Sequence, residues 1–233
     1  MRTNLDQPVS PSPESITADV SLGDLATRWA GASRVFVRHG LDFCCNGRES
    51  IAAACRRKGL EPGGIVAELL AELTAPTDDT GWQDRPTEAL VRHIVARYHQ
   101  GHRDELPRLV RMASKVEAVH GDKPFCPRGL AAFLQLLGED LESHMQKEEQ
   151  VLFPLLLAAA HAHAAMPITV MEREHEQHGV NLTRLRQLAH DFVPPAQACG
   201  TWRALYLGLA EFEREVMQHI ALENHVLFPR ARA

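Results

Sequence analysis

Apolar residues in the C-terminal two-thirds of the chain recur at the spacing of one face of an α-helix. Leu90, Ile94 and Tyr98 show this spacing near the start of the first segment. Four long segments of this kind occupy residues 87–119, 127–160, 168–190 and 201–228. Alternating patterns typical of strands are nearly absent. Because short loops join the segments, residues 87–233 are predicted to form an antiparallel four-helix bundle in an all-α protein.

Shorter helical segments precede the bundle and predict a small helical domain over residues 16–74. Ser21 can cap a helix that runs through Ala30, Ser33 begins a second that ends at Gly40, and Ser50 caps a third. A fourth follows the glycines at 63 and 64. The polar residues 75–86 contain two prolines and a glycine and are predicted to be a linker. Residues 1–15 are predicted to be a disordered tail.

The composition is that of a globular protein, with 45% apolar and 24% charged residues. A net charge of -5 argues against a nucleic-acid partner. No apolar run is long enough to span a membrane, and the N-terminus lacks the apolar centre of a secretory signal. Five cysteines, an odd number, argue against a disulfide framework. We therefore expect a soluble cytoplasmic protein without a membrane partner.

The two halves of the predicted bundle repeat one another. His144 and Glu148 in the second helix correspond to His219 and Glu223 in the fourth, with a difference of 75 in residue number. A V-L-F-P tetrad begins three residues after each glutamate. A duplicated pair of helices places equivalent side chains around a pseudo-twofold axis in the centre of the bundle. A dinuclear metal site needs that symmetry.

Histidine is unusually frequent, and nearly all of the 13 lie between residues 92 and 226. In an H-x-x-x-E motif both side chains lie on one helix face, so two facing helices supply two imidazoles and two carboxylates. One inward histidine from each remaining helix raises the number of ring nitrogens to four. Such a set suits two non-haem iron ions bridged by carboxylates and an oxo or hydroxo group, with manganese as the alternative.

The choice of histidine on the first and third helices stays open on spacing alone. His99 and His102 lie one turn apart near the apolar stripe, and His175 and His178 repeat them with a difference of 76. Helical periodicity does not select one member of either pair.

A ferritin-like arrangement, built from E-x-x-H pairs, is a competing interpretation. Glu117 with His120 and Glu172 with His175 have that spacing, but they share no common offset. The remaining histidines are interpreted as groups at helix C-termini or as surface groups: His161, His163 and His190 for the former, His93 and His225 for the latter. Three acidic residues flank the proposed ligands and either orient imidazoles or are solvated: Asp140, Glu149 and Glu174.

Several motifs resemble the RIC/ScdA/YtfE family of di-iron proteins with a hemerythrin-like domain. They are H-M-Q-K-E-E-Q-V-L-F-P (144–154), H-I-A-L-E-N-H-V-L-F-P (219–229), R-Y-H-Q-G-H-R-D-E-L-P (97–107) and K-V-E-A-V-H-G-D-K-P (115–124). The segment R-V-F-V-R-H-G-L-D-F-C-C-N-G (34–47) is similar to the family's small N-terminal domain. The resemblance covers residues 16–231. One departure is Asn46, where the family has glycine after the cysteines, and a left-handed turn is expected to be preserved there.

The resemblance implies a hemerythrin-like bundle in which His99 and His175 are the ligands from the outer helices. The implied ligand set is His99, His144, Glu148, His175, His219 and Glu223. His102 then joins the three flanking acids as a candidate for contacts to the ligands. Four histidines, where oxygen-carrying hemerythrin has five, argue against reversible oxygen carriage.

Cys44 and Cys45 are adjacent in a predicted loop, where they are candidate redox thiols. A vicinal disulfide is strained and easily reduced, and the nearby Arg48 can favour the thiolate. The alternative is that one of the pair only packs as a small apolar residue. Three further cysteines are interpreted as structural: Cys55, Cys126 and Cys199.

The resemblance implies repair of iron–sulfur clusters damaged by nitric oxide or oxidants, through supply of iron to damaged iron–sulfur proteins. Two other functions stay open. One is reduction of nitric oxide to nitrous oxide at the two metals. The other is binding of nitric oxide, oxygen or iron without turnover, as in a sensor. A homodimer is expected from the resemblance alone.

Overall fold

The computed structural model describes residues 16–72 and 81–232. The predicted disordered tail and most of the predicted linker lie outside these residues. Within them the secondary structure is helical, with one isolated β-bridge between Ser21 and Ser50 and no strand. The all-α prediction is therefore confirmed. None of the helices in the described ranges has the length and apolar character needed to cross a membrane.

The chain divides into two compact units, Met1–Gly81 and Trp82–Ala233. The first contains four short helices: α1 (Leu22–Arg28), α2 (Ala30–Arg38), α3 (Ile51–Lys58) and α4 (Pro62–Glu72). Ser21 and Ser50 act as helix caps, since each hydroxyl accepts a hydrogen bond from a backbone N–H three residues on, at 3.2 Å. The second helix begins earlier than predicted, and Ser33 is buried inside it.

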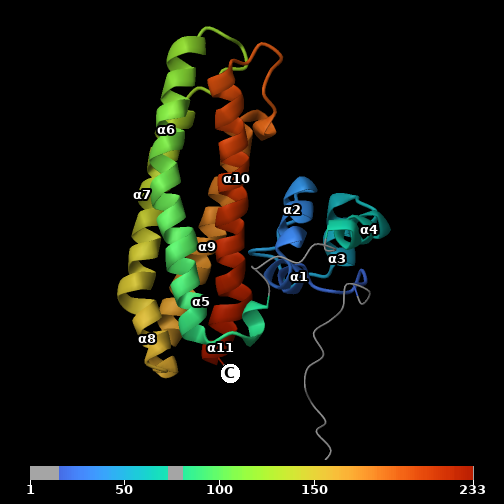
Figure 1. Cartoon of the computed structure of the whole chain (residues 1–233), viewed down its shortest axis with the longest axis vertical. Coiled ribbons are helices and arrows are strands. Elements are labelled where there is room, and N and C mark those ends of the chain that lie inside the picture. The colour runs from blue at the N-terminus through green and yellow to red at the C-terminus, as the bar shows by residue number, and fades with distance from the viewer. Residues whose placement is uncertain (1–15, 73–80, 233) are drawn as a thin grey trace, which may run out of the picture. The chain divides into compact units, whose positions relative to one another are not determined.

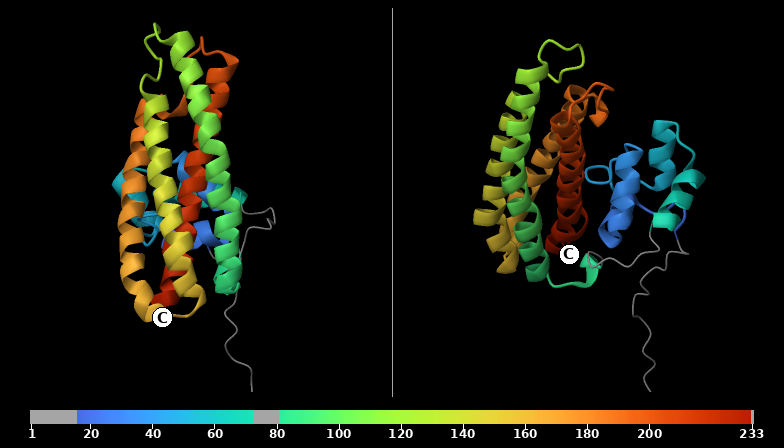
Figure 2. Two further views of the ribbon diagram at one scale, coloured as in Figure 1. Left: turned by 90° about the vertical axis from the view of Figure 1, so that its left-hand side faces the viewer. Right: turned by 45° about the horizontal axis from the view of Figure 1, so that its top comes forward.

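The second unit is a four-helix bundle whose long axis is vertical in Figure 1 and which Figure 2 shows from two further sides. Successive long helices run in opposite directions. A short 3₁₀ helix, η2 (Trp82–Asp84), precedes them. The first long helix consists of α5 (Thr87–His93), η3 (Ile94–His99) and α6 (Gln100–His120). The second consists of α7 (Leu130–Lys147), η4 (Glu148–Leu152) and α8 (Phe153–Leu157). The third is α9 (His161–Leu188), followed by η5 (His190–Phe192), and the fourth consists of α10 (Gly200–Leu222), η6 (Glu223–Leu227) and α11 (Phe228–Arg232).

The third long helix begins at His161, seven residues before the predicted start at Ile168. Pro167 lies inside the helix. A proline removes one backbone hydrogen bond, but Ala164 and Ile168 on either side of it are fully buried, and this packing offsets the loss. His161 and His163, both predicted near a helix C-terminus, are therefore in the first turn of α9 instead.

Three of the long helices contain a π-helical segment: η3, η4 and η6. Segments η4 and η6 end immediately before Phe153-Pro154 and Phe228-Pro229. A proline lacks the N–H that an α-helix needs at that point, so the ladder of hydrogen bonds changes register there. Single π-turns inside α-helices are rare, and those that occur are often found at functional sites.

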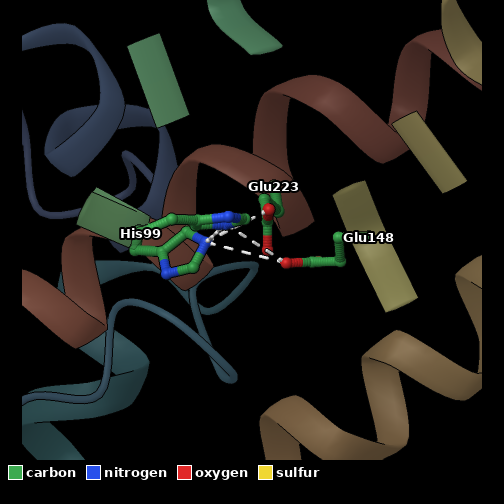
Figure 3. A group of neighbouring side chains, drawn as sticks. His99, Glu148 and Glu223 are labelled. Atoms are coloured by element: carbon green, nitrogen blue, oxygen red, sulfur yellow. Dashed lines mark hydrogen bonds and ion pairs between the residues drawn. The ribbon is translucent and has the colours of Figure 1, made fainter. Parts of the chain in front are cut away.

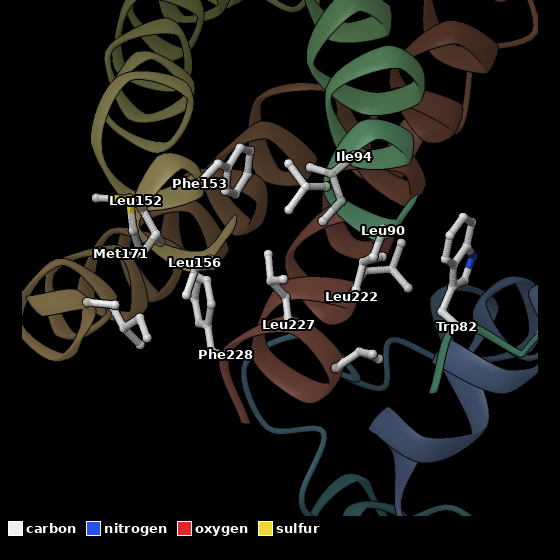
Figure 4. Packing of buried hydrophobic residues seen from close by; sticks show 14 of the residues in the cluster. Trp82, Leu90, Ile94, Leu152, Phe153, Leu156, Met171, Leu222, Leu227 and Phe228 are labelled. Atoms are coloured by element: carbon white, nitrogen blue, oxygen red, sulfur yellow. The ribbon is translucent and has the colours of Figure 1, made fainter. Parts of the chain in front are cut away.

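A cluster of buried apolar side chains fills the end of the bundle where α5, α8 and α11 lie (Figure 4). Leu152 with Phe153 and Leu227 with Phe228, the apolar centres of the two tetrads, are all within it. Trp82 also packs into this cluster. The repeated tetrads therefore build one shared core below the duplicated H-x-x-x-E motifs.

Candidate metal centre

Glu148 lies at the start of η4 with 0% of its surface exposed. Its two oxygens face different histidines. Oε1 is 3.4 Å from Nε2 of His144, and Oε2 is 3.4 Å from Nε2 of His99. Oε2 is also 4.0 Å from Nε2 of His219. The carboxylate therefore stands between imidazoles from α7, η3 and α10.

Glu223 occupies the equivalent place at the start of η6 and is also 0% exposed. Its Oε1 is 3.2 Å from Nε2 of His219, and its Oε2 is 3.0 Å from Nε2 of His175. Figure 3 shows both carboxylates reaching the same place as the His99 ring. Each glutamate thus offers one oxygen to the pair His99 and His219 and its other oxygen to the pair His144 and His175.

The four histidines form two pairs. Nε2 of His99 is 3.1 Å from Nε2 of His219, and Nε2 of His144 is 3.2 Å from Nε2 of His175. The structure therefore brings together all six predicted ligands as two groups that share both carboxylates: His99, His219, Glu148 and Glu223 in one, and His144, His175, Glu148 and Glu223 in the other.

The residue after each shared glutamate forms a hydrogen bond with the predicted histidine ligand of the first or the third long helix. Nδ1 of His99 is 2.7 Å from Oε1 of Glu149, and Nδ1 of His175 is 2.9 Å from Oδ1 of Asn224. Glu149 also accepts a hydrogen bond from Arg103 at 2.9 Å. Because carboxylate and amide oxygens only accept, Nδ1 carries the proton in both rings. Nε2 then presents its lone pair to the cluster.

The histidines of the two H-x-x-x-E motifs have different supports. Nδ1 of His144 is 2.9 Å from Oε2 of Glu174. The other oxygen of this carboxylate, Oε1, accepts a hydrogen bond from Lys147. At the corresponding position beside His219 stands Tyr98, whose ring stacks on the imidazole with centroids 5.6 Å apart. Nδ1 of His219 has no hydrogen-bond partner among the described residues. The two halves of the cluster are therefore chemically different.

The phenylalanine of each tetrad packs on an outer histidine. Phe153 stacks on His99 and Phe228 stacks on His175, with ring centroids 5.7 Å apart in each pair. These contacts fix the plane of each imidazole. The V-L-F-P tetrads thus orient predicted ligands as well as filling the core.

Two further buried histidines lie beside the cluster. His102 is 2% exposed with its ring 5.5 Å from that of His219, and His178 is 4% exposed with its ring 4.8 Å from that of His144. Burial and the neighbouring imidazole lower the pKa of both, that of His178 to about 3. Both are therefore neutral, and neither is in the two groups of convergent atoms.

The cluster carries negative charge in a buried place. Burial raises the pKa of Glu148 and Glu223, but imidazoles around them outweigh it and the pKa of each carboxyl lies below its ordinary value. Burial lowers the pKa of His144, yet Glu148 and Glu174 outweigh it and raise this pKa to about 10. Two buried carboxylates thus require positive charge beside them. Metal cations would supply it in place of protons.

The donor set fits non-haem iron. Imidazole nitrogen and carboxylate oxygen are ligands that suit iron, and no described cysteine belongs to the cluster. Three of the four imidazoles have Nδ1 held by an oxygen acceptor. This leaves their Nε2 atoms for a metal, as in many metal sites.

The other residues singled out in the sequence lie elsewhere. Asp140 is exposed and makes no hydrogen bond or ion pair with the cluster in the described part of the chain. The ferritin-like alternative is wrong, because Glu117 accepts a hydrogen bond from the backbone of Ala131 and Glu172 pairs with Arg232. Three histidines are exposed, namely His161, His163 and His190, and two are partly buried, namely His93 and His225.

Asn224, Tyr98 and Arg103 contact the cluster or its supports but were not anticipated. Only Asn224 had a sequence signal, because it occupies the position in the repeat that Glu149 has in the other half. Tyr98 was assigned to the apolar stripe, which it also joins. These contacts run between helices far apart in the sequence, so local patterns do not reveal them.

The cysteine pair lies in the loop between α2 and α3 of the N-terminal unit. Neither cysteine is in a disulfide, and their Sγ atoms are 3.6 Å apart. Asp42 organises this loop, since Oδ1 accepts hydrogen bonds from the backbone N–H groups of Cys44 at 3.2 Å and Cys45 at 3.0 Å. Asn46 does not adopt the expected left-handed conformation. Instead it donates a hydrogen bond to Asp42 at 2.6 Å.

Cys44 is buried, and its pKa is raised well above its ordinary value by the hydrogen bond with Cys45, by burial and by the charge of Asp42. The suggested lowering of the thiol pKa by Arg48 is therefore wrong for Cys44. Cys55 and Cys126 are buried, as expected of structural residues, whereas Cys199 is exposed, with Sγ 3.2 Å from Nε2 of His120.

Comparison with known proteins adds to this geometry. Residues 90–231 match the family described as the hemerythrin HHE cation binding domain, and residues 18–73 match ScdA_N, a domain of unknown function. The chain is 48% identical over 211 residues to the iron-sulfur cluster repair protein YtfE of Yersinia pseudotuberculosis serotype O:1b (strain IP 31758). It is 47% identical over 211 residues to the protein of the same name from Yersinia pestis (strain Pestoides F). Each alignment covers 91% of this chain and 96% of the relative.

Proposed function

This chain belongs to the family of the YtfE iron-sulfur cluster repair proteins, with a hemerythrin HHE cation-binding domain, and from that premise we propose that it repairs damaged iron–sulfur clusters by donating iron. The six convergent side chains would hold the iron as a pair of ions. The partners are proteins with clusters damaged by nitric oxide or oxidants. Since such clients are intracellular, we place the protein in the cytoplasm.

The observation that carries this proposal is the sharing of both carboxylates between two histidine pairs. A single metal would need only one such group. Two groups of donor atoms meet at Glu148 and Glu223, and we propose that each would hold one metal ion. Nitrogen and oxygen donors without a thiolate hold ferrous iron less firmly than cysteine-rich sites do, which suits an iron donor.

Bound iron would be released to an acceptor as the ferrous ion. The described residues orient the ligands and shield them from water. Glu149, Glu174 and Asn224 orient imidazoles, while Phe153 and Phe228 cover the rings and exclude water. We propose that the N-terminal unit is a separate domain. Its cysteine pair, Cys44 and Cys45, would serve as redox thiols during iron transfer.

The proposal is tested with a hydratase whose cluster has been damaged by nitric oxide. Iron-loaded protein should restore hydratase activity faster than the same concentration of free ferrous iron. The matched control is Glu148→Ala, which removes a carboxylate from both metal positions. Mössbauer spectra of the loaded protein should show roughly two coupled irons per chain. Recovery no better than with free iron, or a chain that binds zinc alone, would contradict the proposal.

A second candidate function is coupling of two nitric oxide molecules to nitrous oxide. It needs two metal positions at one place, and the shared carboxylates offer that arrangement. Single-turnover measurement of nitrous oxide decides between the functions. A yield equal to that of Glu148→Ala would exclude the reductase.

A further inference from the structure

The six cluster residues are between 0% and 1% exposed, so iron needs a path through the bundle. A cavity of about 230 Å³ lies between α6 and α10. It is lined by Arg97, Gly101, His102, Glu105, Glu211, Phe212 and Glu215. A water molecule takes about 30 Å³ in the liquid, so the cavity has room for an ion with part of its hydration shell.

His102 separates this cavity from the cluster. It lines the cavity, and its ring lies 5.5 Å from that of His219 and 5.5 Å from that of Phe212. The residue is 2% exposed, and its Nε2 has no hydrogen-bond partner among the described residues. A buried imidazole nitrogen without a partner is costly, and it is also a ligand atom for a transition metal.

Carboxylates that can receive a cation line the cavity. They belong to Glu105, Glu211 and Glu215, and their arginine partners are Arg97, Arg108 and Arg214. Oε2 of Glu215 pairs with Arg97 at 2.7 Å, and the side chains of Arg97 and Glu215 are 49% and 11% exposed. The guanidinium of Arg97 therefore reaches solvent and can turn away from the buried carboxylate when a divalent ion arrives.

A second cavity has the opposite character. It is lined by residues that include Arg108, Arg111 and Lys115, and its lining carries no carboxylate. His178, at the pseudo-symmetric position of His102, lines neither of these two cavities. The cavity at His102 therefore lies beside the His219 half of the cluster.

We propose that ferrous iron enters and leaves the cluster through the cavity between α6 and α10, with His102 as a transit ligand between His219 and the carboxylates at the mouth. The ion moves as Fe²⁺ throughout, so no electron transfer is involved. This route rests on the proposed iron-donating function and identifies the half of the cluster that gives up its iron first.

The test measures how fast iron leaves the full-length protein. Each variant is loaded with ferrous iron without oxygen, its iron content is determined, and the colour of the ferrous ferrozine complex is followed after mixing. In Gly101→Leu a side chain fills the cavity from its outer side, and the nearest atom to an added Cβ is Nη1 of Arg97 at an ordinary 3.7 Å. His102→Leu removes the transit ligand.

We expect both variants to release iron about tenfold more slowly, equivalent to about 1.4 kcal/mol of added barrier, and Gly101→Leu to keep the full iron content. The matched controls, Gly101→Ala and His178→Leu, should release iron at the rate of the unaltered protein. Unchanged release from Gly101→Leu, or equal slowing in His102→Leu and His178→Leu, would overturn the route. Ferrozine is the iron acceptor in this test in place of a damaged cluster. The release rate therefore tests the route even if the protein does not repair clusters. A chain that holds no iron overturns both.

Discussion

At the scale of single residues, the cluster depends on side chains that touch imidazoles and not the metal positions. Glu149, Glu174 and Asn224 each accept a hydrogen bond from an Nδ1–H. Each such contact fixes the tautomer and the direction of Nε2, and it makes the ring a stronger donor. A predicted ligand is therefore effective only together with the acceptor behind it.

Glu174→Ala should weaken ferrous iron binding by about tenfold or more, because His144 loses the acceptor that fixes its ring. Competition against a chelator of known affinity measures the change. Glu176→Ala is the matched control, since Glu176 is exposed on the same helix. Equal affinities in the two variants would show that Glu174 is only a partner of Lys147.

Cys44 should react with iodoacetamide at neutral pH more slowly than any exposed thiol of the chain, Cys199 in particular. Its raised pKa leaves little thiolate, and its burial restricts access. Mass spectrometry of peptides after timed quenching gives the rates. Asp42→Asn should accelerate the reaction of Cys44 because it removes a negative charge. Asp19→Asn, at an exposed site, should not.

At the scale of elements, the π-helical segments place three of the predicted ligands. His99 ends η3, while Glu148 and Glu223 begin η4 and η6. A π-turn changes the direction in which later side chains leave the helix. This change lets the glutamates enter the cluster while the tetrads that follow still face the core.

A buried ion pair ties α9 to α10 and makes stability depend on pH. Glu213 is 3% exposed and is bound by Nε of Arg186 at 2.6 Å. Burial raises the pKa of Glu213, and Arg186 does not cancel this effect. Folding thus favours the protonated acid, so its stabilisation is present below the ordinary pKa and is lost as the pH rises through the folded-state pKa.

Glu213→Gln should therefore gain stability relative to the natural chain as the pH rises from below the ordinary pKa of a glutamate through the raised pKa of Glu213. Urea denaturation at a series of pH values measures this difference. Glu211→Gln is the contrasting variant, because arginine lowers the pKa of Glu211 and its trend should have the opposite sign. Parallel curves for Glu213→Gln and the natural chain would contradict the assignment.

The sequence revealed the elements better than their details. The apolar spacing predicted all four long helices, because a buried stripe requires that spacing. It missed the start of α9, since the penalty for Pro167 is offset by burial that sequence does not show. It also missed the π-turns, because helical apolar spacing does not distinguish a π-turn from a turn of α-helix.

At the scale of the whole molecule, duplication explains how much of the site was predictable. The offset of 75 between His144 and His219 placed both H-x-x-x-E motifs in one centre, and the structure brings them together there. The choice of His99 over His102 could not come from spacing, because both side chains are buried on the same side of the first helix. Only resemblance to a family selected between them.

Removal of metal should lower the melting temperature of the bundle. Binding to the folded state alone stabilises it by about 2.7 kcal/mol at a free iron concentration 100 times the Kd, which corresponds to a shift of about 5–10 °C for a unit of this size. Calorimetry of loaded and chelator-stripped protein measures the shift. A variant with both Glu148→Ala and Glu223→Ala should show none, and an equal shift in that variant would place the iron elsewhere.

The unequal supports of His144 and His219 have a consequence for how charge is shared between two bound ions. His144 has the carboxylate of Glu174 behind it, whereas Nδ1 of His219 has no hydrogen-bond partner among the described residues and the ring of Tyr98 stacks on this imidazole. The more basic donors stabilise the higher oxidation state. After one-electron reduction we therefore expect trapped valences, with the ferric ion beside His144 and the ferrous ion beside His219. Mössbauer spectra should resolve two distinct irons, and a single averaged signal would show that the duplication is electronically symmetric.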